Sequence, residues 1–293
     1  MRAKTEIKEN EEITTRYVGP WEGQPRRQHK IEQNWKFICN CIRCHDPTDL
    51  GTYFSAIICQ KCLDHDIAEK DAIQNNGISG DVCNGFSKQS FGYLLPIDTQ
   101  ILGTPWQCSS CGVTKSVNDI ENILETEEKN MNTRKAEILI TMNENFSNTV
   151  KCVSRSATML EGKLHPNHCL LFQFKNWVSE LRFPTRPIHN CDLDEAVNEN
   201  DSTIQLTDKI AFLELQMEYH AENLKIMEVL DPGLTLNRAG HHKKMAQRRI
   251  QLSKYKMLSG SENYTKLQHK AQMEIAMLEF GEVLKSNLFR SFC

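Results

Sequence analysis

Seven cysteines stand at short, regular spacings in the first half of the chain. They form two C-x2-C pairs and one tight triplet: Cys59 with Cys62, Cys108 with Cys111, and Cys39, Cys41 and Cys44 within "FICNCIRCH". A C-x2-C turn presents two sulfurs to one metal ion, and two such turns complete the tetrahedral shell of a structural zinc. The two pairs therefore predict a zinc ribbon that uses all four of their sulfurs.

The triplet supplies three sulfurs, whereas a closed structural zinc site needs a fourth ligand. His45 is adjacent in sequence, but the chain would have to turn sharply to present both neighbouring side chains to one ion. We expect the fourth ligand to lie elsewhere in the chain or outside it. "CIRCH" also spells the haem-attachment motif, which the extra Cys39 and the absence of an export signal disfavour.

The connection between the two C-x2-C pairs indicates a small sheet with an insertion. Residues 64–90 are polar and rich in glycine and asparagine, which predicts an inserted loop. "FGYLLPID" after it predicts a short apolar strand that ends at a proline. Cys83 lies alone inside the loop, and we expect it to be an idle thiol.

Composition and charge restrict the class of protein. The start of the chain has no apolar segment typical of a signal peptide, and no apolar run is long enough for a membrane helix. We therefore expect a cytoplasmic or nuclear protein, in which twelve reduced cysteines indicate metal rather than disulfides. With a net charge of -3 and three lysines against six acidic residues in 57–112, direct binding of nucleic acid is not expected.

From about residue 118 the sequence becomes helical in pattern. We expect Asn118 or Asp119 to cap a first helix, and a second to begin after Pro166 with His165 and His168 packed at its start. Apolar residues at helical spacing predict a long helix that "DPG" at 231–233 ends. Two more helices are predicted over 238–258 and 262–288. The fold class is therefore α+β and mostly α, with a helical bundle or tetratricopeptide-like stack after the cysteines.

The segment "NEEITTRYVGPWEGQPRRQHKIEQNWKFICNCIRC" resembles part of a known protein family. Its acidic pair, Ile13-Thr14 and Tyr17 resemble the E-E-[IL]-T-x-x-Y motif that closes the catalytic core of SET-domain lysine methyltransferases. The cysteine triplet is similar to the post-SET segment of that family. The spacing and the helix opened by Pro25 resemble the SET-and-MYND subfamily, and "DPTDLGTYFSAIICQKC" resembles its insect branch.

The resemblance implies roles that the residues alone do not establish. Tyr17 would align the acceptor lysine, and Phe37 would stack on the adenine of S-adenosylmethionine, the methyl donor. The substrate implied is a lysine-containing protein such as a histone. Without the resemblance, Tyr17 would be a half-buried strand residue and Phe37 a core residue.

The resemblance also implies a domain plan and a departure from the family. Residues 1–36 would be the end of a SET domain, 37–117 the post-SET cluster and ribbon, and 118–293 a helical domain. The family's Asn-His motif, the cysteine beside it that supplies the fourth post-SET ligand, and the MYND finger have no counterpart before Tyr17. We therefore expect a portion of a zinc-binding protein-lysine methyltransferase that is inactive by itself.

Two other functions remain open. A non-catalytic, zinc-stabilised scaffold could bind proteins in transcriptional regulation. A zinc-ribbon nucleic-acid binder is the weaker alternative because of the acidic charge around the ribbon.

Overall fold

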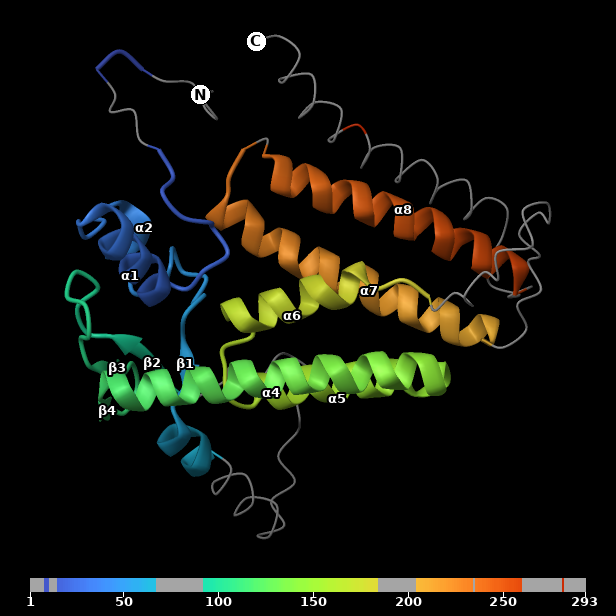
Figure 1. The fold of residues 1–293 in the computed structure, drawn as a ribbon, viewed down its shortest axis with the longest axis horizontal. Helices are drawn as coiled ribbons and strands as arrows, with labels where there is room; N and C mark the ends of the chain where they lie inside the picture. The colour runs from blue at the N-terminus through green and yellow to red at the C-terminus, as the bar shows by residue number, and fades with distance from the viewer. Residues whose placement is uncertain are drawn as a thin grey trace, which may run out of the picture. The chain divides into compact units, whose positions relative to one another are not determined.

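The computed structural model (Figure 1) describes most of the chain. The described residues are 8–10, 15–66, 92–183, 204–233, 235–259 and 281. The chain divides into two compact units. The first, which we call the cysteine unit, comprises Thr15–Asn130 and Thr158–Phe172; the second, the helical unit, comprises Met1–Thr14, Met131–Ala157 and Gln173–Cys293.

A four-stranded antiparallel sheet organises the cysteine unit. Its strands follow the chain in the order β1 (Ile57–Ile58), β2 (Tyr93–Pro96), β3 (Trp106–Cys108) and β4 (Thr114–Lys115). Leu94 of β2 pairs with both Ile57 and Cys108, which brings the ends of β1 and β3 near each other. The predicted apolar strand is β2, and it ends at Pro96 as expected.

Two helices precede the sheet. The first, α1 (Gln24–Trp35), has proline in its first turn and ends where Lys36 adopts a left-handed conformation with φ of 60°. Proline suits the first turn of a helix because its missing N–H would have no partner there. The second, α2 (Ile42–His45), is a single turn that carries Cys44.

A long helix, α4 (Val117–Glu144), contributes residues to both units. Of the two predicted cap residues, Asp119 takes part in the cap, but it does so together with Ser116, which was not predicted. The Asp119 N–H donates to Ser116 Oγ at 3.2 Å, and the Ser116 N–H donates to Asp119 Oδ2 at 3.2 Å. This reciprocal pair satisfies two N–H groups that the helix leaves free.

Helices make up most of the described part of the helical unit. After η1 (Phe146–Asn148) come α5 (Thr149–Glu161), α6 (Cys169–Glu180), α7 (Leu206–Leu230) and α8 (Leu236–Leu258). The predicted long helix is α7, the prediction over 238–258 is α8, and the two pack against each other (Figure 1). The prediction over 262–288 lies outside the described residues except for 281. A bundle and a tetratricopeptide-like stack both contain such a pair, so the choice between them stays a prediction.

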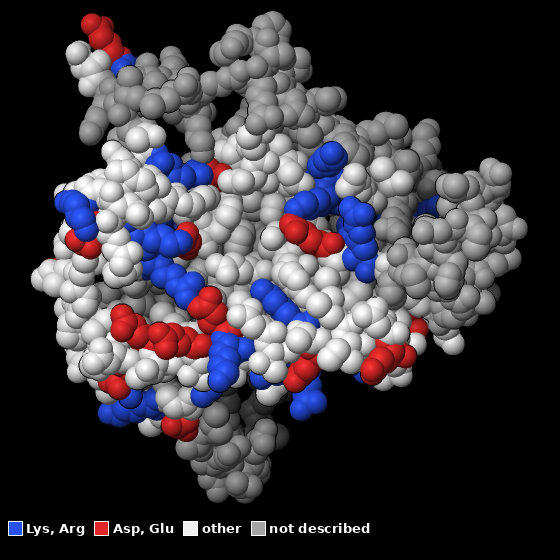
Figure 2. Space-filling model, in the orientation of Figure 1, with Lys and Arg blue, Asp and Glu red and all other residues white. Residues whose placement is uncertain are grey.

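The fold class predicted from the sequence, α+β and mostly α, is confirmed. Figure 2 shows acidic and basic side chains interspersed on the face drawn. Within the described ranges, no helix combines the length and apolar character needed to cross a bilayer.

Candidate metal centres

The four ribbon cysteines lie on two turns of the sheet. Cys59 directly follows β1, and Cys62 lies one helical turn later. Cys108 ends β3, and Cys111 precedes Gly112, whose φ of 70° lets the chain reverse into β4. We call these four cysteines the ribbon centre.

The sulfurs of the ribbon centre have the spacing of a tetrahedral metal shell. Cys59 Sγ lies 3.7 Å from Cys111 Sγ, and Cys62 Sγ lies 3.7 Å from Cys108 Sγ. All four sulfurs lie within 4.8 Å of one another. Zinc–sulfur bonds of about 2.3 Å place tetrahedral ligands about 3.8 Å apart, whereas a disulfide needs a sulfur separation of about 2.05 Å. The four thiols are free, and their spacing fits zinc.

Backbone N–H groups support the negative charge that zinc ligands carry. Cys108 Sγ accepts hydrogen bonds from the N–H groups of Ser110 at 3.4 Å and Cys111 at 3.5 Å. A hydrogen bond from the Val113 N–H is the main cause that lowers the pKa of Cys111 to about 7. Burial raises the pKa of Cys59 to about 12. A bound cation would offset that burial cost by stabilising the thiolate.

Gly92 forms part of the wall of the ribbon centre. Its carbonyl oxygen accepts a hydrogen bond from the Cys59 N–H at 3.0 Å. A Cβ atom at this position would lie 2.4 Å from Cys108 Sγ and 2.8 Å from the backbone nitrogen of Ser110. Only glycine allows the backbone to pass this close to the sulfur.

The triplet cysteines also converge, and we call them the triplet centre. The sulfurs of Cys39, Cys41 and Cys44 lie within 4.8 Å of one another. Burial acts to raise the pKa of Cys41, but hydrogen bonds led by the Cys44 N–H lower it on balance. Among the described residues, neither His45 nor any other His, Cys, Asp or Glu side chain joins this group. The triplet centre therefore offers three ligands from this part of the chain.

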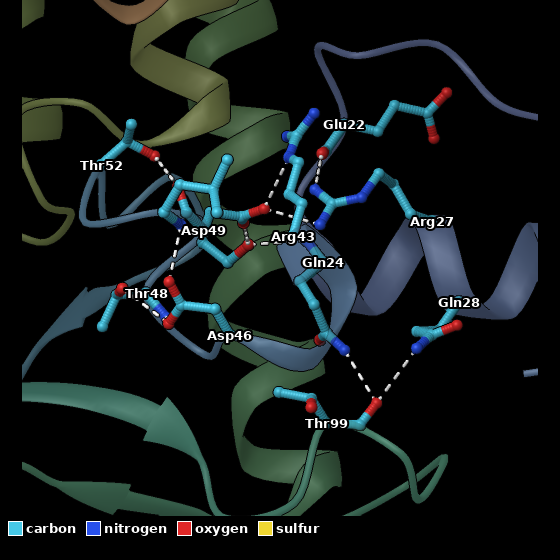
Figure 3. A network of polar contacts seen from close by, with 12 residues as sticks. Glu22, Gln24, Arg27, Gln28, Arg43, Asp46, Thr48, Asp49, Thr52 and Thr99 are labelled. Carbon is cyan, nitrogen blue, oxygen red and sulfur yellow. Dashed lines mark hydrogen bonds and ion pairs between the residues drawn. The ribbon is translucent and has the colours of Figure 1, made fainter. Parts of the chain in front are cut away.

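A buried network of charges (Figure 3) includes Arg43, the residue that precedes Cys44 in α2. Asp49 has no solvent-exposed side-chain surface. Its Oδ1 accepts hydrogen bonds from Arg27 Nη2 at 2.6 Å and Arg43 Nε at 2.9 Å, and its Oδ2 accepts one from Ser55 Oγ at 3.0 Å. Arg27 Nη1 also donates to the carbonyl of Glu22 at 2.8 Å. These contacts connect α1, α2 and the segment before β1.

Two glutamines of α1 hold neighbouring loops: Gln28 binds the backbone of Cys39, and both Gln24 and Gln28 bind Thr99. Gln28 Nε2 donates to the Cys39 carbonyl at 2.8 Å, while the Cys39 N–H donates to Gln28 Oε1 at 2.9 Å. Gln24 and Gln28 both donate to the carbonyl of Thr99, at 3.0 and 3.2 Å (Figure 3). The loop after β2 is thereby held against α1 beside the triplet centre.

The two residues that the family resemblance selects lie next to each other. The Tyr17 ring contacts Phe37 edge-on at 5.1 Å and Trp35 edge-on at 5.3 Å, measured between ring centroids. Tyr17, Trp35 and Phe37 are 44%, 45% and 37% exposed. We call these three side chains the aromatic cluster. Such exposed rings leave faces free to stack on a planar ligand.

His165 and His168 pack at the start of α6, as predicted. The Asn167 N–H donates to His165 Nδ1 at 3.0 Å, and the Leu170 N–H donates to His168 Nδ1 at 3.2 Å. Burial lowers the pKa of these two histidines to about 4 and about 3. Cys83 and most of the predicted inserted loop lie outside the described residues.

Several residues around the centres escaped sequence reasoning. The sequence around Asp49 predicts an ordinary surface turn, and the sequence around Arg27 predicts a solvent-exposed helix. Neither pattern indicates a buried ion pair. Trp35 carried a signal, because it is an aromatic residue close to Phe37 and the triplet. Gly92 follows a glycine-rich stretch, so no pattern separated it from its neighbours.

Comparison with known proteins relates parts of the chain to SET-domain proteins. The SET domain-containing protein SmydA-8, isoform A, of Drosophila melanogaster is 29% identical over 111 residues, which is 38% of this chain and 18% of that protein. The histone-lysine N-methyltransferase SET5 of Candida glabrata is 44% identical over 48 residues, or 16% of this chain and 9% of SET5. SET5 of Meyerozyma guilliermondii is 48% identical over 44 residues, or 15% and 9%.

These matches span less than a fifth of the length of the relatives. No protein-family model matches the chain, and no solved structure matches it. What the comparisons support is a relationship to SET-domain methyltransferases, in a chain whose cysteine clusters could hold zinc.

Proposed function

We propose that the chain carries the zinc-binding, post-SET part of a protein-lysine N-methyltransferase. The observation that carries this proposal is the convergence of three sulfurs at the triplet centre, two residues along the chain from Phe37 in the aromatic cluster. The relatives named as histone-lysine methyltransferases support the reaction class.

The ribbon centre would hold a structural zinc and stabilise the sheet. The triplet centre would hold a second ion through Cys39, Cys41 and Cys44, with its fourth ligand from outside the described residues. We expect about one tightly held zinc per chain, in the ribbon centre, and a weaker second ion, because three ligands leave the shell incomplete.

The aromatic cluster would supply the chain's contribution to methyl transfer. S-adenosylmethionine, when bound, supplies the methyl group on a sulfonium. The exposed ring of Phe37 would stack on its adenine, and the Tyr17 hydroxyl would align the amine of a lysine in a protein substrate such as a histone. The role of Tyr17 is then one of positioning, which can account for large rate effects from small displacements. These chemical roles fit a cytoplasmic or nuclear protein.

The test measures methyl transfer from S-adenosylmethionine to lysines of core histones by the full-length protein. Tyr17→Phe should lower turnover about a hundredfold, because the amine loses its alignment. Tyr93→Phe is the matched control, since Tyr93 lies in β2 and packs against His165 instead.

A zinc-loaded protein that neither binds S-adenosylmethionine nor transfers methyl groups would contradict the enzymatic proposal. That result would leave the alternative, a zinc-stabilised scaffold for protein partners in transcriptional regulation.

A further inference from the structure

The buried charges around Asp49 do not balance among themselves. The Asp49 carboxylate pairs with Arg27 and with Arg43, whose side chains are only 4% and 14% exposed. One negative charge therefore meets two guanidinium groups in a region that excludes water (Figure 3). A buried charge without a counter-charge is strongly unfavourable.

Besides Asp49, both arginines lie close enough to the Cys44 sulfur to interact with it electrostatically. Asp49 Oδ1 joins Arg27 to Arg43, and Arg43 directly precedes Cys44 in α2. Arg43 Nη2 is buried and has no hydrogen-bond partner among the described residues. Since Cys44 is itself buried, a metal-bound thiolate there would carry the negative charge that the network lacks.

The same helix turn also fixes a second ligand. Arg27 is followed in α1 by Gln28, which exchanges two hydrogen bonds with the backbone of Cys39. Of two consecutive side chains of α1, Gln28 contacts Cys39 directly and Arg27 is linked through Asp49 to the turn that carries Cys44. This arrangement resembles the outer shell that orients ligands in metal sites.

We propose that Arg27 is a positioning residue for the metal of the triplet centre. Its guanidinium group binds Asp49, and through Asp49 and Arg43 it holds the α2 turn that carries Cys44. The same three buried side chains balance the charge of the metal–thiolate cluster. This inference rests on the proposed function, because it requires an ion at the triplet centre.

The experiment is a cobalt(II) titration of the reduced, metal-free full chain, followed by the sulfur-to-cobalt and ligand-field absorption bands. The ribbon centre should fill first and the triplet centre second. Arg27→Met should weaken the second step about 10- to 100-fold and alter its ligand-field band, with the first step unchanged. Arg27→Lys keeps the positive charge but loses the paired hydrogen bonds of the planar guanidinium group. Its second step should therefore be weaker than that of the wild-type chain but stronger than that of Arg27→Met.

Arg26→Met is the matched control, because Arg26 is the preceding residue of α1 and pairs instead with Glu128. It should leave both steps unchanged. If Arg27→Met folds poorly, Arg27→Lys still tests the role of Arg27, because its second cobalt-binding step should be weaker than that of the wild-type chain.

The outcomes separate the two proposals. A wild-type chain with a second step that Arg27→Met and Arg27→Lys leave unchanged would overturn the role of Arg27 alone. A wild-type chain without any second step would overturn metal binding at the triplet centre, and the role of Arg27 with it.

Discussion

At the scale of single residues, the ribbon centre depends on residues that let its four sulfurs lie within reach of one metal ion. The four cysteines provide the sulfurs, but the distance between them depends on how closely β2 passes the end of β3. Gly92 sets that distance, because any Cβ there would lie 2.4 Å from Cys108 Sγ. The ribbon centre therefore requires a residue without a Cβ at this position.

Gly92→Ala should therefore prevent tight metal binding at the ribbon centre. The clash involves backbone as well as sulfur, so relief requires a shift of β2 against β3. We expect loss of the tightly held zinc and a decrease of about 3 kcal/mol or more in the free energy of unfolding. Zinc content by mass spectrometry and chemical denaturation measure the two effects.

Gly240→Ala provides the control, because Gly240 lies inside α8 and a Cβ there meets nothing within 4 Å. It should keep the zinc and gain up to about 1 kcal/mol of stability. A Gly92→Ala variant with full zinc content would show that the sheet does not hold the sulfurs as described.

The candidate metal ligands could be predicted from residue types and spacing. The buried residues that hold those ligands in place could not. Cysteines at C-x2-C spacing are a local pattern, which one sequence displays directly. Asp49 and Arg27 meet across 22 positions of chain, so their pairing exists only after folding. The roles of Tyr17 and Phe37 stay predictions, although the structure places their rings in contact.

At the scale of helices, α7 and α8 share a buried pair of histidines. His220 Nδ1 and His241 Nδ1 lie 3.2 Å apart, so one ring donates and the other accepts. Burial, followed by the charge of His241, lowers the pKa of His220 to about 3. Burial, followed by the charge of Lys244, lowers the pKa of His241 to about 4. Both rings are therefore neutral in the packed helices.

The pair should make the helical unit sensitive to acid. Unfolded histidine has a pKa of about 6.5, so below that pH the unfolded chain binds protons that the folded pair rejects. Stability is fully present above about pH 6.5 and falls as the pH drops toward 4. His241→Asn should remove about 1–2 kcal/mol of this loss between pH 7 and pH 5, measured by denaturation at each pH.

His29→Asn is the control, because His29 is exposed on α1 and should leave the pH profile unchanged. A His241→Asn variant with the acid sensitivity of the wild-type chain would show that the pair does not control the packing of α7 on α8.

Long helices with many apolar residues and clear ends could be predicted from the sequence. The helix α7 has both features: it ends at Leu230, Asp231 is its C-cap, and Gly233 follows with a φ of 85°. The helix α5 was not predicted, because it follows η1 without a proline, a glycine or a capping bond from Asn145. The start of α4 was misplaced because Ser116 and Asp119 form the cap together.

For the whole molecule, the division into a cysteine unit and a helical unit concentrates every candidate metal ligand of the described residues in one unit. The sequence indicated that the cysteines precede the helices. It did not indicate that α4, α5 and α6 each contribute residues to both units. Such sharing depends on how helices pack, which periodicity along one helix does not specify.

Zinc-edge X-ray absorption of the purified, reduced chain tests the central claim most directly. We predict about one tightly bound zinc per chain, surrounded by sulfur at about 2.3 Å. A folded chain that contains no zinc, or whose cysteines are joined at the disulfide distance of about 2.05 Å, would contradict the account.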